Sequence, residues 1–148
     1  MTYTVRPAVP ADLAGVVRVL ARATAEVAVS DHQEAMWARM LATDDLTVFV
    51  AAADHGEVVG TTSLLVLPNL TYDCRPTAFF EPMVVAAEHR RRGVGRLLVE
   101  AVLAGARAAG CWKVQVVSHV RHTDDGAYDF YRALGFEGEA TGFRRYLE

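Results

Sequence analysis

An arginine- and glycine-rich run, Arg90-Arg91-Arg92-Gly93-Val94-Gly95, lies between a short apolar stretch at 83–85 and a segment with helical period. This order predicts a strand that leads through a tight turn into a helix. The N–H groups in the first turn of a helix have no intrahelical partner and lie at the positive end of its dipole. Glycines let a ligand approach the backbone, and guanidinium groups donate charge-assisted hydrogen bonds to phosphate. The run is therefore typical of a phosphate-binding turn.

Two familiar phosphate motifs are excluded. A dinucleotide fingerprint needs a third glycine where this chain has Leu98, and the Gly-x-x-x-x-Gly-Lys-Ser/Thr run of a P-loop is absent. The pattern that remains, Arg-x-x-Gly-x-Gly after a strand, resembles the pyrophosphate loop of the GNAT superfamily of acyl-CoA-dependent N-acetyltransferases. The alternative is an arginine-rich surface turn before an ordinary amphipathic helix.

A second stretch strengthens the resemblance. Residues 127–136 read Ala-Tyr-Asp-Phe-Tyr-Arg-Ala-Leu-Gly-Phe, which resembles the other GNAT signature, a short helix carrying Phe-Tyr and closed by Leu-Gly-Phe. Gly135 fits the position just after a helix, where a left-handed residue is needed. The resemblance extends from about residue 5 to the C-terminus and is most specific over 81–136. The run Leu67-Pro68-Asn69-Leu70-Thr71, followed by Arg75-Pro76, resembles a bacterial subgroup of unassigned small-molecule acetyltransferases.

Bulk properties narrow the class of protein. The chain has 148 residues, 52% of them hydrophobic, so a single domain over 1–148 with a sizeable core is expected. A net charge of −3 and a pI near 5.9 argue against nucleic acid as a partner. Two cysteines without Cys-x-x-Cys spacing indicate neither a disulfide framework nor a metal site. Without an apolar leader or a long apolar run, we expect a cytoplasmic protein that does not bind membranes.

Periodicity predicts alternating strands and helices. Ser30 and Gln33 form a capping-box pattern, residues 54–57 a hairpin turn, and Gly60 a bulge or a close backbone approach. Residues 68–76 are expected to form a loop, and Thr123 or Asp124 to cap the Phe-Tyr helix. The expected strands lie at 2–6, 46–53, 58–67, 77–85, 112–118, 136–139 and 143–147, and the other helices at 10–20, 30–41 and 93–109.

The resemblance implies a fold and a donor. The fold is α/β (α+β), a mixed central sheet with helices on both faces, whose middle strands, here 77–85 and 112–118, splay apart. Backbone groups in the gap cannot pair within the sheet, so an extended ligand such as pantetheine could pair with them. The donor is acetyl-CoA. Its pyrophosphate would lie on the N–H groups of 91–96, and its pantetheine arm beside 83–85; the implied residues are Met83, Val84, Val85, Arg90, Arg91, Arg92, Gly93, Val94, Gly95 and Arg96.

Acetyl transfer to an amine also needs an acid and a base. Tyr131 matches the tyrosine of the family's Phe-Tyr pair and is the candidate general acid, since a phenol is protonated at neutral pH. Glu81 lies on the same strand face as Val85 and is a candidate base, acting directly or through water. His119 is its rival, because an imidazole titrates near neutral pH. Pro82 removes one N–H from the ladder and predicts a bulge or kink beside Glu81.

These features predict an N-acetyltransferase that moves an acetyl group from acetyl-CoA to a primary amine by direct attack in a ternary complex. The alternative is a non-catalytic acyl-CoA-binding sensor or interaction module on the same fold. Acidic side chains in the first two helices and the 68–76 loop favour a small cationic acceptor. Homodimers are common among similar proteins, although no self-complementary patch is visible in the sequence.

Overall fold

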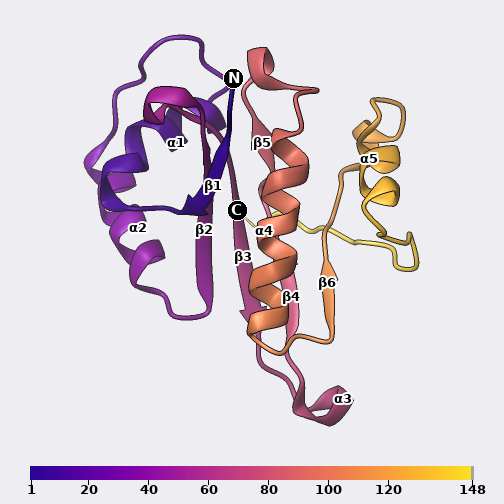
Figure 1. Ribbon diagram of the computed structural model, residues 1–148. Helices are drawn as coiled ribbons and strands as arrows, with labels where there is room; N and C mark the ends of the chain where they lie inside the picture. The colour runs from indigo at the N-terminus through magenta and orange to yellow at the C-terminus, as the bar shows by residue number, and fades with distance from the viewer. Residues whose placement is uncertain (148) are drawn as a thin grey trace. The chain divides into compact units, whose positions relative to one another are not determined.

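The computed structural model describes residues 1–147, which form two compact units, residues 1–115 and the part of the chain from Val116 onward (Figure 1). The first unit contains a six-stranded sheet. Its strands are β1 Thr4–Pro7, β2 Leu46–Ala52, β3 Val58–Leu67, β4 Thr77–Phe80, β5 Val84–Val85 and β6 Lys113–Gln115.

The helices are divided between the two units. The first unit holds α1 Leu13–Leu20, α2 Asp31–Ala42, α3 Thr71–Cys74 and α4 Val94–Ala108, with short 3-10 turns at Pro10–Asp12, Asp54–Gly56 and Ala87–His89. The second unit holds the 3-10 turn Val120–His122 and α5 Ala127–Ala133. Within residues 1–147, no helix has both the length and the apolar character needed to cross a membrane.

The sheet is mixed, as expected. Its strand order is β1-β2-β3-β4-β6, with β5 pairing β3 beyond the end of β4. All neighbours are antiparallel except β4 and β6, which run parallel from Thr77 opposite Lys113 to Phe79 opposite Gln115. The parallel ladder stops there, and among the described residues β5 pairs only with β3. The segments 77–85 and 112–118, which were predicted to splay apart, therefore pair with each other only near their N-terminal ends, over 77–79 and 113–115.

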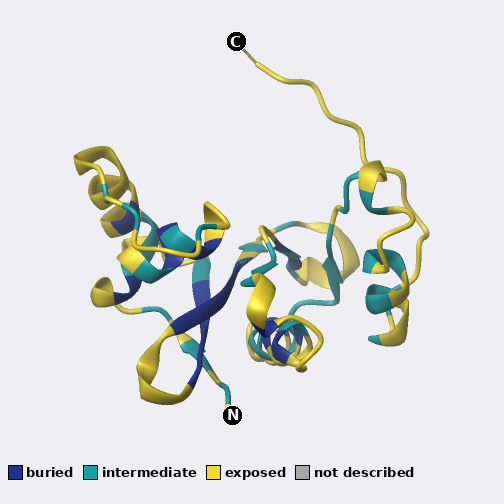
Figure 2. Ribbon diagram, turned by 90° about the horizontal axis from the view of Figure 1, so that it is seen from above, coloured by how far each residue is buried: buried dark blue, intermediate teal, exposed yellow. Residues whose placement is uncertain are grey.

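Helices cover both faces of the sheet, which also confirms the prediction. On one face α4 packs closely, because a Cβ at Gly60 would lie 3.2 Å from Leu98 and a Cβ at Gly105 would lie 2.9 Å from Leu64. Gly60 is thus the close approach expected from the sequence. On the other face α1 and α2 enclose a core with β2 and β3, formed by Val16, Val19, Trp37, Val48, Val50 and Val58. Figure 2 shows this burial along β2 and β3.

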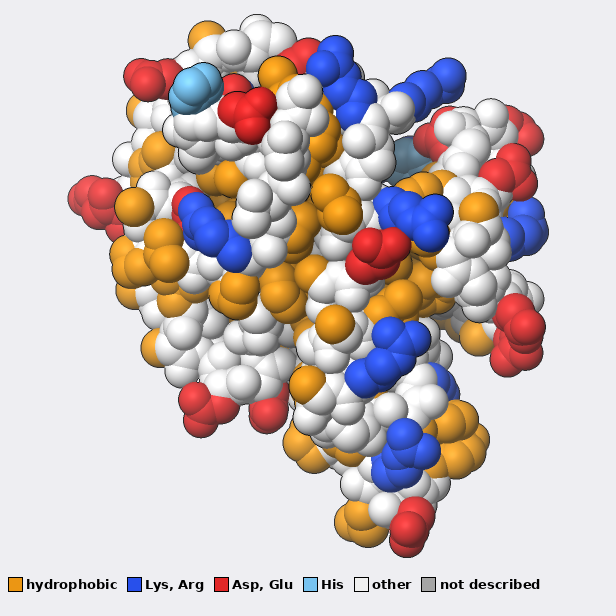
Figure 3. All heavy atoms as spheres, in the orientation of Figure 1, with side chains coloured by type: hydrophobic (Ala, Val, Ile, Leu, Met, Phe, Trp, Pro, Cys, Tyr) orange, Lys and Arg blue, Asp and Glu red, His pale blue; other side chains and the backbone are white. Residues whose placement is uncertain are grey.

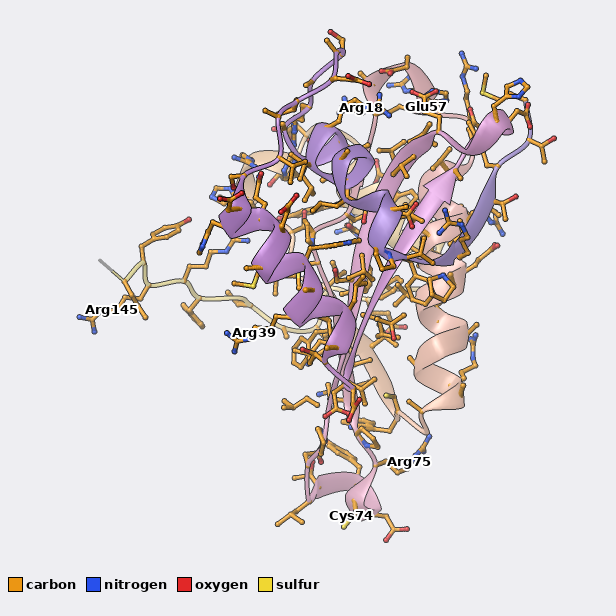
Figure 4. All side chains as sticks on the ribbon, turned by 90° about the vertical axis from the view of Figure 1, so that its left-hand side faces the viewer. Arg18, Arg39, Glu57, Cys74, Arg75 and Arg145 are labelled. Atoms are coloured by element: carbon orange, nitrogen blue, oxygen red, sulfur yellow. The ribbon has the colours of Figure 1, made fainter. Side chains whose placement is uncertain are left out.

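Two polar contacts join α1 to the sheet. An Arg18 guanidinium nitrogen donates a 2.6 Å hydrogen bond to the Val58 carbonyl and lies 3.1 Å from Glu57 (Figure 4). The predicted capping box at the start of α2 is also present, since the Gln33 N–H donates to Ser30 Oγ at 3.1 Å and the Ser30 N–H donates to Gln33 Oε1 at 3.0 Å. Local signals of this kind were sufficient to locate the N-terminus of α2.

The strand expected at 77–85 is divided into β4 and β5. The Glu81 N–H still donates to the Ser63 carbonyl at 3.1 Å, and pairing resumes with Val84 opposite Thr61. Two residues, Pro82 and Met83, therefore stand opposite one residue of β3, which is a β-bulge. Pro82 has no N–H to give to a ladder and follows a cis peptide bond. The bulge beside Glu81 was expected from Pro82.

The strands predicted near the C-terminus were wrong. The expected strand at 112–118 is only β6, because its partner β4 ends at Phe80. The expected strands at 136–139 and 143–147 do not form. Phe143 and Leu147 are 92% and 89% exposed there. Glu137 and Glu139 would project from the same side of a strand and repel each other.

Two local predictions also need correction. The 68–76 segment is not all loop, because α3 forms a turn in which Tyr72, Asp73 and Cys74 have φ of 52°, 59° and 59°. Neither Thr123 nor Asp124 caps α5. The residue before α5 is Gly126, at φ 88°, and the Asp125 carboxylate accepts the Ala127 N–H at 3.0 Å. An aspartate two residues before a turn N–H makes this contact readily.

Candidate active site

The turn before α4 has the geometry of an anion site. Gly93 lies at the N-cap of α4 with φ 83° and ψ 0°, a left-handed conformation that favours glycine, and a Cβ at Gly93 would meet no atom within 4 Å. Arg91 is also left-handed, at φ 58°. The first N–H groups of α4 have no helical partner and lie at the positive end of a 15-residue helix. The backbone here can accept an anionic group.

Contacts with the N-terminal segment and with β5 hold this turn in place. His89 is buried, and its Nδ1 lies 3.0 Å from the Tyr3 hydroxyl of the N-terminal segment. Arg90 closes the turn against β5, because its Nε donates to the Val85 carbonyl at 3.1 Å while its N–H donates to the Ala87 carbonyl. The turn is thus supported from two elements outside α4.

The arginines of the turn divide into two kinds. Arg90 is held by Val85, and Arg96 pairs with Glu100 at 2.9 Å. Arg91 and Arg92 are exposed and make no hydrogen bond or ion pair within residues 1–147. In Figure 3, Lys and Arg side chains are visible at the top of the view and at several other places on this face. Two cations are therefore available to an anion that reaches the start of α4.

One edge of β5 directs backbone groups away from the sheet. Because the Ala86 N–H donates to the Val59 carbonyl at 2.8 Å, its neighbour Val85 must direct its N–H and C=O to the opposite side. The hydrogen bond from Arg90 to the Val85 carbonyl agrees with this direction. Val84 faces β3 instead, and Met83 lies in the bulge, outside the ladder that fixes these directions. Of the three residues predicted to meet pantetheine, Val85 offers outward backbone groups.

Glu81 lies at the bulge between β4 and β5. Its backbone is fixed by the Ser63 carbonyl, and its side chain is exposed. The residues predicted for donor binding, 83–85 and 90–96, follow Glu81 in the chain and belong to the same unit.

Tyr131 lies in the second unit, in the last turn of α5. Its carbonyl accepts the Phe136 N–H at 3.1 Å, and the Arg132 carbonyl accepts the Gly135 N–H at 3.0 Å. With Gly135 at φ 87° this is a Schellman motif. The Tyr131 ring also meets Phe136 edge to face, with ring centroids 5.9 Å apart. Burial raises the pKa of the Tyr131 hydroxyl above its usual value of 10, so the group is a proton donor at neutral pH.

His119 belongs to the second unit as well, but it does not end a strand as expected. It precedes the 3-10 turn Val120–His122, and its Nδ1 accepts the Arg121 N–H at 3.1 Å. Because a backbone N–H can only donate, Nδ1 is unprotonated and the ring proton lies on Nε2. His119 would have to lose this capping bond to take up a proton at Nδ1.

Two contacts were not predicted from the sequence. The structural role of Arg90 had no sequence signal beyond its place in the arginine run. Asp125 accepts hydrogen bonds from both His122 and the Ala127 N–H, and the hydrogen bond with His122 is the main reason why the pKa of Asp125 is lowered. An Asp-Gly pair before a helix could have indicated this turn.

Comparison with known proteins decides the family. The model of the acetyltransferase (GNAT) family matches residues 16–136, which is most of the chain and spans both units. The chain belongs to this family.

Individual relatives agree with the assignment. The chain is 33% identical over 136 residues to an aminoglycoside N(6')-acetyltransferase type 1 from Stenotrophomonas maltophilia, covering 90% of this chain and 86% of the relative. It is 29% identical over 89 residues to a glucosamine 6-phosphate N-acetyltransferase from Trypanosoma brucei brucei, covering 60% of this chain and 57% of that protein. A solved structure from Agrobacterium tumefaciens strain C58, described as an acetyltransferase, has a TM-score of 0.85 and 36% identity over 97% of this chain and 99% of its own.

Family membership settles the broad activity. The protein is an N-acetyltransferase, and acetyl-CoA is the acyl donor of its family. The alternative of a non-catalytic acyl-CoA sensor is not favoured.

Proposed function

We propose that this acetyltransferase transfers the acetyl group of acetyl-CoA to a primary amine by direct attack within a ternary complex. The observation that carries the proposal is the turn before α4, where a left-handed Gly93 and two unpaired arginines accompany free N–H groups at a helix start. Acetyl-CoA supplies an acyl group activated as a thioester. The new C–N bond forms as the C–S bond breaks, one proton leaves the amine, and one joins the thiolate.

Donor binding falls to the first unit. The N–H groups of residues 91–96 and the guanidinium groups of Arg91 and Arg92 would hold the pyrophosphate, with Arg96 shared with Glu100. Arg90 would act mainly by holding Val85 in place. Met83 and Val85 would hydrogen-bond the amides of the pantetheine arm, and Val84 would secure the strand from the other side.

There are two candidates for the general base, the carboxylate of Glu81 and the imidazole of His119. The hydrogen bonds favour Glu81. Its exposed carboxylate is available to an amine or to a water molecule, whereas His119 Nδ1 already accepts the Arg121 N–H. Tyr131 would protonate the leaving thiolate, because burial keeps its hydroxyl protonated at neutral pH. We extend the proposal to one domain over residues 1–148, since the family match runs through both units.

The acceptor is an amine. The relatives from Stenotrophomonas and Trypanosoma are named for aminoglycoside and glucosamine 6-phosphate, and Glu81 would attract an ammonium group before it loses its proton. A homodimer is part of the proposal only by analogy with similar proteins.

Release of free coenzyme A tests this function. With acetyl-CoA and a panel of primary amines, a thiol-reactive dye should report release that depends on the amine and saturates with both substrates. A matched panel of tertiary amines, which cannot form a stable amide, is the control. Release at the same rate without any amine would contradict transfer to an amine.

A further inference from the structure

We propose that the acceptor amine carries an apolar body, which lies on an exposed part of the sheet that we call the acceptor floor. The acceptor floor consists of Ser63, Leu65, Leu67, Phe79 and Glu81. This inference rests on the proposed function and names the class of its acceptor, an arylalkylamine or a similarly apolar primary amine rather than a sugar with many charges.

Strand register places these five residues on one face. Leu65 stands opposite Phe79 in the antiparallel pair of β3 and β4. Two residues further along, the Glu81 N–H donates to the Ser63 carbonyl. Residues two apart in a strand point to the same face. Leu64 and Gly60 contact α4, so the odd-numbered residues of β3 from Ser63 onward face away from α4.

The same face is covered elsewhere but not here. Further along the sheet it is closed by α1 and α2, which bury Val48 and Val50. Leu65 and Leu67 remain 42% and 48% exposed. Figure 4 shows α1 and α2 over one part of the strands and the strands continuing beyond them to α3. Adjacent exposed apolar side chains on a sheet face mark a binding surface more often than isolated ones do.

This face carries few charged side chains, with an acidic one at one end and a basic one at the other. Glu81 is the one acidic residue among the positions that the register assigns to it in β3, β4 and β6. It lies at the end next to β5, where the donor arm is proposed to bind. Lys113 lies at the other end, opposite Thr77, with its ammonium 4.6 Å from the Trp112 ring centroid. A single carboxylate can pair with one ammonium group. A polycationic sugar would instead place its remaining ammonium groups beside Leu65 and Leu67, without an acidic partner on this face.

Spacing sets the form of the acceptor. The pair Leu65 and Phe79 is two residues from Ser63 and Glu81, or about 7 Å along the strand. A nitrogen near Glu81 with a phenyl group two carbons away would bring the ring toward Leu65 and Phe79. The ring would exchange water for apolar contact, which is the main source of affinity for such a group.

Coenzyme A release from three acceptors tests the proposal: 2-phenylethylamine, kanamycin and glucosamine 6-phosphate. We expect kcat/KM to be highest for 2-phenylethylamine, by roughly tenfold or more over both sugars. Leu65→Thr should raise the KM for 2-phenylethylamine by roughly tenfold with little change in kcat. Leu20→Thr is the matched control, since Leu20 is 43% exposed but belongs to α1, and it should leave KM unchanged.

Failure of this inference can be told from failure of the proposed function. If a sugar is preferred, or if Leu65→Thr and Leu20→Thr behave alike, the apolar acceptor is wrong while amine acetylation stands. If no amine releases coenzyme A from a protein that is stabilised by acetyl-CoA, both fail. A change from dimer to monomer in Leu65→Thr by light scattering, with KM unchanged, would assign the surface to a second copy of the chain and overturn the proposal.

Discussion

Tyr131 has a backbone fixed by the end of its own helix and a hydroxyl whose pKa is raised by burial. A group that must donate a proton at neutral pH needs to keep that proton, and burial disfavours the phenolate. We therefore expect Tyr131→Phe to lower kcat by about 10²-fold, while the dissociation constant of acetyl-CoA is unchanged. Steady-state kinetics and calorimetry measure the two quantities.

The pH profile provides the second part of this test. Because the pKa lies above its usual value of 10, the midpoint for loss of the acid form should lie above pH 10 in the wild-type protein, and no such limb should limit the rate near pH 8. Equal losses of kcat and of acetyl-CoA affinity in Tyr131→Phe would instead assign the residue to packing against Phe136.

Glu81 and His119 make different predictions for the base. Glu81→Gln keeps the size of the side chain but cannot take a proton, so we expect kcat to fall by about 10²-fold. His119→Gln keeps an acceptor for the Arg121 N–H and should retain most of the activity. Rates measured from pH 6 to pH 10 compare the two variants with the wild type. The reverse order of effects would transfer the base role to His119.

At the scale of elements, one ion pair links β1 to the turn that begins α1. Asp12 is buried, accepts from Arg6 at 2.7 and 2.9 Å, and accepts the Val9 N–H at 2.8 Å. The hydrogen bond from Arg6 is the main reason why the pKa of Asp12 is lowered. A carboxyl with a lowered pKa in the folded state contributes stability above its unfolded pKa and loses it as the pH falls through the folded value.

Acid unfolding measures this contribution. Asp12→Asn should lower the free energy of unfolding at pH 7 by about 2 kcal/mol, a modest value because Arg6 is partly exposed. Urea titrations from pH 7 down to about pH 3 should show the difference between variant and wild type shrinking below about pH 4. A difference that stays constant over that range would mean that the Asp12 charge is not what stabilises the contact.

Elements with local signals could be predicted, and those that depend on distant partners could not. The start of α2 followed from Ser30 and Gln33, the end of α5 from Gly135, and the bulge from Pro82. The length of β6 depends on where β4 ends, which no residue near 115 reveals. Of the candidate site, the turn at 90–96 could be predicted because glycine and arginine have specific roles there. The hydrogen bond from Arg90 to Val85 could not, since it depends on tertiary geometry.

At the scale of the whole molecule, the two units carry different parts of the chemistry. Residues 1–115 hold the turn, the outward edge of β5 and Glu81, whereas the second unit holds Tyr131 and His119. No described residue from 116 onward is fully buried (Figure 2), and Tyr131 is among those that are half-buried. The strongest internal packing, and therefore most of the stability, belongs to the first unit. Donor binding should therefore be measurable as stabilisation of that unit.

Thermal unfolding with and without acetyl-CoA is the most direct test of the central claim, that the turn before α4 binds the donor. At about 100 times its dissociation constant, a ligand stabilises the folded state by about 2.7 kcal/mol, so the Tm of the wild-type protein should rise by several degrees. Gly93→Glu should abolish the rise. Gly56→Glu is the matched control, because Gly56 has the same φ of 83° and the same open surroundings but belongs to the hairpin turn. The account predicts that Gly56→Glu keeps the rise; an undiminished rise in Gly93→Glu would contradict it.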